Sequence, residues 1–176
     1  MTGTMKAIIF DLDQTLVDSR HIEHLRRSRQ WSTVYQKKIP TILAYDGINE
    51  VLSVTRDNGI KLAIVSSSPS SYVQRVVRHF GWSFDFTVCY HDTNQHKPHP
   101  APFIEAVNRL KIAAGDCWAI GDDPEDIIAA RAAGIYAVAA LWGSPDRDSL
   151  ESAKLDIIFE TVTSFYKAIY DYLLYN

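Results

Sequence analysis

The stretch "AIIFDLDQTLVDS", residues 7–19, places two aspartates directly after a run of apolar, β-branched residues. The run predicts a buried strand. Asp11 and Asp13 then sit at its end, two residues apart, where like charges repel. Either they face solvent in a turn that caps a helix, or a cation lies beside them. The rest of the sequence has to decide between these interpretations.

Five more apolar runs resemble the first, and helical patterns lie between most of them. The runs are residues 60–66, 86–90, 117–122, 135–141 and 155–159, and the helical patterns are residues 46–58, 69–80, 100–111 and 124–133. Continuous apolar runs, in place of alternating ones, are typical of strands covered on both faces. Strand and helix in alternation therefore predict an α/β fold with a mostly parallel central sheet between two layers of helices.

Ligands of such sheets bind beyond the carboxyl ends of the strands. The residues at those ends are Asp11 and Asp13, then Ser66 to Ser68, then Asp122 and Asp123. Carboxylates and hydroxyls thus occur where this fold places its ligand groups. The sequence predicts a site at that edge.

Size and composition are typical of a globular protein. The chain has 176 residues, 47% of them hydrophobic and 22% charged, which favours a single domain over residues 1–176. It contains no run of about 20 uncharged apolar residues, as a membrane helix requires, and no signal-peptide pattern. Two isolated cysteines, Cys89 and Cys117, indicate a reducing compartment, so we expect a cytoplasmic protein.

Charge is distributed unevenly. Residues 20–45 hold six basic residues and one acid, a net charge of +5, so the remainder of this −3 chain carries −8. A basic segment suits a polyanionic substrate such as a nucleotide, a sugar phosphate or the end of a nucleic acid. A solvated helix that balances an acidic body explains the charge equally well.

Four motifs together resemble the haloacid dehalogenase-like hydrolase superfamily, in its phosphatase branch. They are "DLDQT" (11–15), "VSSSP" (65–69), "KP" (97–98) and "GDDPED" (121–126), in the family's order. The resemblance implies a Rossmann-like fold, a Mg²⁺ cofactor and hydrolysis of a phosphomonoester through an aspartyl-phosphate. Dehalogenation is disfavoured, since dehalogenases lack a second acid at the position of Asp13.

The resemblance assigns roles to the acids. Asp11 is the expected nucleophile and Asp13 the expected general acid and then base, which requires Asp13 to be protonated when the substrate binds. The expected metal ligands are the carboxylates of Asp11 and Asp122 and the backbone carbonyl of Asp13. A dication bound beside Asp11 and Asp13 would offset the repulsion between their carboxylates.

Phosphate-binding and supporting groups follow from the other motifs. The Ser66 hydroxyl, the Ser67 amide and the Lys97 ammonium are expected to bind the phosphoryl oxygens. Asp126 is expected to orient Lys97 or a metal-bound water. Asp123 could share that role, or it could be the N-cap of the helix that begins at Pro124.

Larger relatives insert a separate helical cap after the first strand, and here residues 20–45 leave room for a minimal insert of one helix. A small lid disfavours phosphomutase chemistry and favours an open site, or a lid supplied by a second subunit. We expect Arg26, Arg27 and Arg29 to assist substrate capture.

Several alternatives remain open. Cys89, His91, His96 and His99 could form a zinc loop or simply a polar loop. The C-terminal helical pattern, residues 161–176, carries tyrosines that could support a homodimer. The fold could also serve as a phospho-acceptor receiver domain, or as a non-catalytic phosphate- or protein-binding module.

Overall fold

The central sheet is parallel throughout. The computed structural model describes residues 5–144 and 146–175. Its main sheet has six strands, which in spatial order are β5 (Phe86–Val88), β4 (Lys61–Val65), β1 (Ala7–Phe10), β6 (Cys117–Gly121), β7 (Tyr136–Ala140) and β8 (Ile157–Phe159). The predicted α/β class is therefore confirmed, and each predicted apolar run contains one of these strands.

Both faces of the sheet are buried. Along β1, Ile8 and Phe10 join one hydrophobic core, while Ala7 and Ile9 join the other, and all four are fully buried. Alternate residues of a strand point to opposite faces. A continuous apolar run is consequently what this strand requires.

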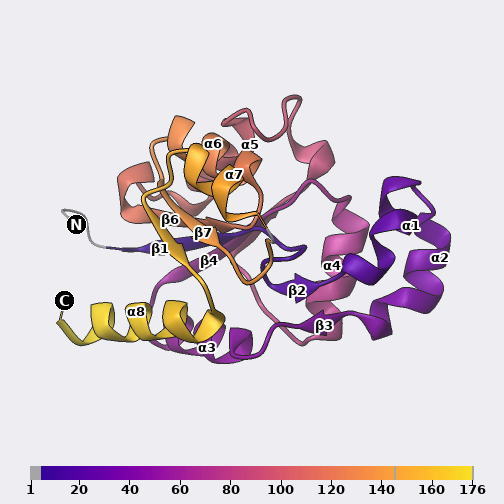
Figure 1. Cartoon of the computed structure of the whole chain (residues 1–176), viewed down its shortest axis with the longest axis horizontal. Coiled ribbons are helices and arrows are strands. Elements are labelled where there is room, and N and C mark those ends of the chain that lie inside the picture. The colour runs from indigo at the N-terminus through magenta and orange to yellow at the C-terminus, as the bar shows by residue number, and fades with distance from the viewer. Residues whose placement is uncertain (1–4, 145, 176) are drawn as a thin grey trace.

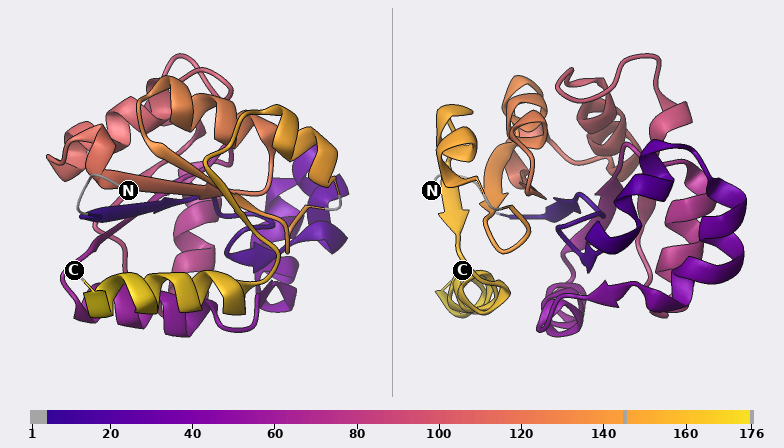
Figure 2. Two further views of the ribbon diagram at one scale, coloured as in Figure 1. Left: turned by 60° about the vertical axis from the view of Figure 1, so that its left-hand side comes forward. Right: turned by 45° about the vertical axis from the view of Figure 1, so that its right-hand side comes forward.

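Helices form the outer layers of a three-layer sandwich (Figures 1 and 2). One face is covered by α5 (Ala101–Leu110), α6 (Pro124–Ala132) and α7 (Arg147–Ser152), and the other by α3 (Ile48–Asp57), α4 (Ser70–His79) and α8 (Val162–Tyr175). Short 3-10 turns occur at Tyr90–Asp92 and Ala114–Asp116. The four helices expected between strands are all present, and α7 was not predicted.

Strand order reverses beside β1. The chain leaves β1 for β4 and β5 on one side, and then returns to β6, β7 and β8 on the other. The loops that follow β1 and β6 therefore separate at the carboxyl edge and leave a crevice between them.

The insert after β1 is more broken than the single helix that the sequence predicted. It comprises a 3-10 turn (Arg20–Ile22), α1 (Glu23–Arg27), α2 (Trp31–Thr33), a π-helical segment (Val34–Lys38) and a second 3-10 turn (Ile39–Thr41). Arg29 has a φ of 56°, in the left-handed region, which interrupts the helix after α1.

A short antiparallel ladder joins the two ends of the insert. It pairs β2 (Val17–Asp18) with β3 (Leu43–Ala44). Ile22, Leu25 and Val34 carry the insert into the same core as α3, α4 and α8, and Figure 1 shows α1 and α2 beside α4. The insert is thus packed onto the sheet domain.

The C-terminal helix closes one face of the sheet. Val162, Phe165 and Ile169 of α8 are buried, while Tyr166 stacks on Tyr170 at 6.2 Å. This arrangement matches the predicted helical spacing. Over the two described ranges of the chain, no helix has the length and apolarity needed to cross a membrane.

Candidate active site

A cavity of about 600 Å³ opens at the carboxyl edge of the sheet. Three strand ends deliver its polar groups: Asp11 follows β1, Ser66 follows β4 and Asp122 follows β6. The predicted site residues that line this cavity are Asp11, Asp13, Ser66, Ser67, Lys97, Asp122, Asp123, Asp126, Arg26 and Arg27. One predicted residue, Arg29, does not line the cavity.

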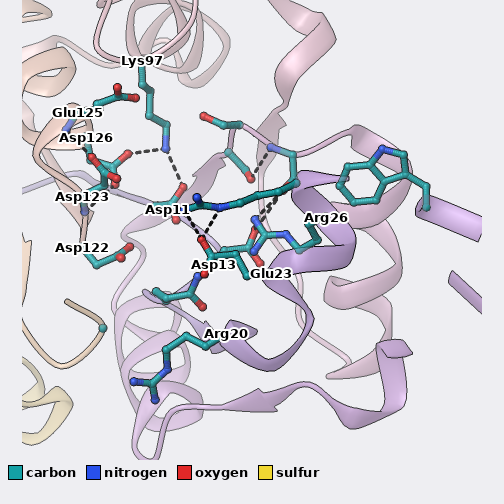
Figure 3. Close-up of a pocket in the computed structure, with 17 residues that line it drawn as sticks. Asp11, Asp13, Arg20, Glu23, Arg26, Lys97, Asp122, Asp123, Glu125 and Asp126 are labelled. Carbon is teal, nitrogen blue, oxygen red and sulfur yellow. Dashed lines mark hydrogen bonds and ion pairs between the residues drawn. The ribbon is translucent and has the colours of Figure 1, made fainter. Parts of the chain in front are cut away.

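Lys97 bridges two of the acids. Its Nζ lies 2.7 Å from Asp11 Oδ1 and 2.5 Å from Asp126 Oδ1, and its side chain is only 5% exposed. Figure 3 shows the lysine between these carboxylates. Burial favours the neutral amine, but Asp11 and Asp126 outweigh it and raise the pKa of Lys97. Lys97 is therefore a fixed cation beside Asp11, and Asp126 orients it.

The ionised carboxylates at this edge of the sheet are destabilised by burial and by one another. Burial, partly offset by Lys97, raises the pKa of Asp11 from 3.8 to about 7. Burial and the charges of Asp11 and Asp126 raise the pKa of Asp122 to about 8. Carboxyl groups held this close in a low-dielectric site repel one another when ionised. A cation bound among them would relieve that repulsion.

The oxygen atoms fit a magnesium ion. Asp11, Asp122 and Asp126 each offer a carboxylate oxygen, and these oxygens lie within 4.8 Å of one another. Mg²⁺ prefers oxygen ligands and usually takes one or two protein carboxylates together with waters. The predicted ligand set shares Asp11 and Asp122 with this group. Asp126 belongs to the group as well, whereas the Asp13 carboxylate lies outside it.

Asp13 is enclosed by four donors. Its Oδ1 accepts hydrogen bonds from Ser19 Oγ and Tyr72 Oη, both at 2.7 Å, and its Oδ2 accepts from Arg26 Nη2 at 2.5 Å and from Ser68 Oγ at 3.1 Å. Burial and the adjacent Asp13 raise the pKa of Tyr72, so this hydroxyl keeps its proton.

These contacts differ from those expected around a protonated Asp13. A guanidinium can only donate hydrogen bonds, whereas the three hydroxyls can donate or accept. The ion pair with Arg26 therefore suits the carboxylate form of Asp13, and the hydroxyls suit either form. Only the contact with Arg26 stands against a role as general acid.

The serines after β4 form the neighbouring wall. Ser66 is 5% exposed and its Oγ accepts a hydrogen bond from the Ser68 amide at 3.1 Å. Ser67, which follows, is exposed at the cavity. A hydroxyl and an amide placed beside Asp11 and Lys97 can both donate to an anion.

Asp123 and Asp126 also organise the start of α6. The Asp123 carboxylate accepts a hydrogen bond from the Glu125 amide at 2.8 Å, and the Asp126 carboxylate accepts one from the Asp123 amide at 3.4 Å. Together these bonds form a capping box. A side chain on Gly121 would come within 2.3 Å of the Asp126 carboxylate. Glycine at the end of β6 therefore lets Asp126 approach the site.

The arginines of the insert occupy different places. The Arg26 side chain is 17% exposed and reaches Asp13, whereas Arg27 is 81% exposed and pairs with Glu23. Arg20 also lines the cavity, and it pairs with Asp18. Figure 3 shows Arg20 well apart from Lys97.

Ser19, Tyr72 and Thr15 were not predicted as site residues, and Ser68 was expected at the strand end without a role. Ser19, Ser68 and Tyr72 contact Asp13, and Thr15 donates to Asp122 at 3.0 Å. Thr15 and Ser68 lie inside the motifs "DLDQT" and "VSSSP", so their proximity to predicted site residues is a usable signal. Tyr72 lies on the buried face of α4, and nothing in the helical pattern of residues 69–80 indicates the direction of its hydroxyl.

The alternative of a zinc loop gains no support. Within the described residues, the acids at positions 11, 122 and 126 form the only cluster of three or more that is tight enough for a metal. Cys89 is buried, and its amide instead bonds Asp92, while His96 stacks on Tyr90 at 4.0 Å.

Fold and site define an α/β domain whose ionisable groups gather at the carboxyl edge of a parallel sheet. The sequence profile of the haloacid dehalogenase-like hydrolases matches residues 20–140. The chain belongs to this family, and the resemblance seen in its motifs is confirmed.

Curated relatives include phosphatases. Phosphoglycolate phosphatase of Xanthomonas campestris pv. campestris is 38% identical over 101 residues, which cover 56% of this chain and 46% of that protein. PpaX of Caldanaerobacter subterraneus subsp. tengcongensis, whose name describes it provisionally as a pyrophosphatase, is 31% identical over 147 residues, 82% of this chain and 66% of PpaX. The chain thus spans about two thirds or less of these relatives.

Solved structures share the fold. A hydrolase from Pseudomonas syringae superposes with a TM-score of 0.82 at 20% identity, covering 94% of this chain and 98% of that one. A haloacid dehalogenase superfamily hydrolase from Ehrlichia chaffeensis gives 0.74, also at 20% identity, covering 98% and 100%. At this identity the likeness concerns the fold alone.

Proposed function

We propose that the protein is a magnesium-dependent phosphatase that hydrolyses a phosphomonoester through a phosphoryl group on Asp11. The observation that carries the proposal is the buried contact of Lys97 Nζ with Asp11 Oδ1 at 2.7 Å, in a cavity shared with Asp122 and Ser66. A carboxylate attacks an anionic phosphate only where cations and donors offset the repulsion. This edge of the sheet supplies both.

The groups for the first step surround Asp11. Its carboxylate oxygen forms a bond to phosphorus while the ester P–O bond breaks. Lys97, the Ser66 hydroxyl and the Ser67 amide hold the phosphoryl oxygens and stabilise the added charge. Asp13, after taking up a proton from solvent, gives that proton to the departing oxygen.

The second step regenerates Asp11. Asp13, now ionised, takes a proton from water, whose oxygen attacks the phosphorus and releases inorganic phosphate and the free carboxylate. Magnesium, held by Asp11 and Asp122 with the Asp13 carbonyl, would supply positive charge to the phosphoryl oxygens. Asp126 keeps Lys97 in place, and Asp123 caps α6 beside them.

The insert faces the leaving part of the substrate. Arg26 lies at Asp13, while Arg20 and Arg27 lie at the rim of the cavity with half or more of their side chains exposed. We propose that the rim arginines draw anionic substrates toward the cavity. Arg29, which does not line the cavity, is no longer included in that group.

The proposal is tested with purified protein and three phosphorylated probes. Inorganic phosphate release is measured from 2-phosphoglycolate, pyrophosphate and p-nitrophenyl phosphate, with Mg²⁺ and with EDTA. We expect turnover of at least one probe that EDTA abolishes and Mg²⁺ restores. A folded protein that releases no phosphate from any probe would support the non-catalytic binding module instead.

A receiver-type domain makes a different prediction. It would keep its phosphoryl group for many minutes after exposure to a small phospho-donor, and it would not turn over repeatedly. Multiple turnovers per protein molecule therefore separate the two functions.

A further inference from the structure

Asp13 has no free position for a substrate. An ionised carboxylate offers about four lone-pair positions, two on each oxygen. Here Oδ1 is taken by Ser19 and Tyr72, and Oδ2 by Arg26 and Ser68. To reach a departing oxygen or a water, Asp13 has to lose one partner.

Arg26 is the partner most able to leave. Ser19 and Tyr72 are fully buried and Ser68 is 4% exposed, whereas the Arg26 side chain is 17% exposed at the cavity. Three hydroxyl contacts remain after Arg26 departs, and these keep Asp13 oriented. The guanidinium carbon also lies 5.3 Å from the centroid of the Tyr72 ring, within the range of a cation–π contact.

Arg26 also carries an unused donor. Nη1 donates to Ser19 at 3.0 Å and Nη2 to Asp13 and Ser68, but Nε is buried and has no hydrogen-bond partner among the residues that the structure describes. A buried donor without a partner costs about 1–3 kcal/mol. An incoming anion would satisfy it.

From these contacts we infer that Arg26 is a positioning residue that blocks Asp13 in the free enzyme and releases it when the substrate brings a second anionic group. The inference rests on the proposed phosphatase function. When the ester oxygen contacts Asp13, the atoms beyond that oxygen lie where the guanidinium lies. A carboxylate or second phosphate there becomes the new partner of Arg26.

A neutral leaving part cannot make this exchange. Separation of Arg26 from Asp13 would then leave a partly buried cation without a counter-charge, which is costly. The contact therefore favours esters whose leaving part is an anion. The other cations of the insert that line the cavity, Arg20 and Arg27, are largely exposed and have surface partners of their own.

The test compares two matched substrates, 2-phosphoglycolate and its uncharged amide, with Arg26→Gln. The wild-type enzyme is expected to prefer the anion. In Arg26→Gln the kcat/KM for 2-phosphoglycolate should fall by at least about tenfold, as expected for a lost ion pair of this burial. The kcat for the amide should rise, because Asp13 is no longer blocked.

Controls separate blocking from simpler roles. Lys37→Gln removes an exposed charge from the same insert, outside the cavity, and should change neither substrate. Arg26→Lys keeps the charge with fewer donors and should restore part of the preference. It also carries the comparison if Arg26→Gln does not fold, as judged by thermal unfolding.

Some outcomes overturn the inference. A parallel loss for both substrates would assign Arg26 a structural role, and a loss for the anion with no rise in kcat for the amide would make it a binding residue only. A wild-type enzyme that prefers the amide contradicts it as well. Failure of the wild-type enzyme to hydrolyse any probe with Mg²⁺ would instead remove the proposed function.

Discussion

The carboxyl edge of the sheet and the insert of residues 20–41 face each other across one cavity, yet they hold their charges differently. At the sheet edge, Lys97 and its two carboxylate partners are almost fully buried. In the insert, Arg20 and Arg27 form exposed pairs with neighbouring acids, and only Arg26 reaches inward. Buried charged groups keep a fixed geometry, while exposed ion pairs contribute little to stability and exchange partners readily.

This difference divides the work of the site. In the proposed function, bond making and breaking depend on groups attached to rigid strand ends, where small displacements matter most. Selection of the substrate is assigned to a short segment with loosely held charges. Substitutions at the edge should therefore lower kcat strongly, and those at the insert should change substrate preference.

The largest effect is expected for Asp11→Asn. The amide keeps the size of the side chain but cannot attack phosphorus, so turnover should fall by about 10⁴-fold or more. Initial rates with Mg²⁺ on the best probe measure this loss. Thermal unfolding of the variant is the control, and activity within tenfold of wild type would exclude Asp11 as the nucleophile.

Lys97→Gln comes next. Loss of this cation should reduce kcat by about 10²–10³-fold, the usual effect of one removed group that stabilises the transition state. Unfolding should also become easier, since Asp11 and Asp126 lose their buried partner. Lys167→Gln, an exposed lysine on α8, is the matched control and should leave both properties unchanged.

Magnesium and pH should act together on stability. The fold raises the pKa of Asp11 to about 7 and that of Asp122 to about 8. In the metal-free protein, the stability that these two groups contribute is therefore greatest below their ordinary pKa of 3.8, and it is lost as pH rises through the raised pKa values. Mg²⁺ binds the ionised carboxylates. The increase in Tm on adding Mg²⁺ should therefore grow between pH 5 and about pH 8. Equal increases at both ends, in differential scanning fluorimetry, would contradict a metal at these acids.

The smallest effect is expected at the rim. Arg27→Gln removes an exposed charge that already pairs with Glu23, so KM for an anionic probe should rise by about threefold or less at low salt. The difference should vanish at high ionic strength because exposed charges are screened. A salt-independent loss of kcat would place Arg27 at the reacting atoms.

The edge of the sheet was largely predictable from the sequence. A ligand group directly after an apolar strand has a position set by the strand itself, so Asp11, Ser66 and Asp122 could be placed at one edge. The role of Asp123 as an N-cap could be foreseen from the Pro124 that follows. These predictions depend on short-range patterns.

The insert was not predictable in the same way. A basic segment of this length indicated one helix, but the left-handed Arg29 interrupts it after α1. The direction of the Arg26 side chain, and that of Tyr72, depends on packing between segments far apart in sequence. The composition of the insert predicts the sign of its net charge, but it does not show which arginine reaches Asp13.

The account depends most on Asp11 as the attacking group, and Asp13→Asn tests this directly. An asparagine at position 13 cannot activate the water of the second step, so a phosphoryl group should remain on the enzyme. The variant is incubated with Mg²⁺ and p-nitrophenyl phosphate, whose leaving group departs without a proton from Asp13, and is then quenched in acid and digested for mass spectrometry. The account predicts that the peptide containing Asp11 gains the mass of one phosphoryl group at that residue. A phosphoryl group on another residue, or none while the wild-type enzyme turns over the same probe, would contradict it.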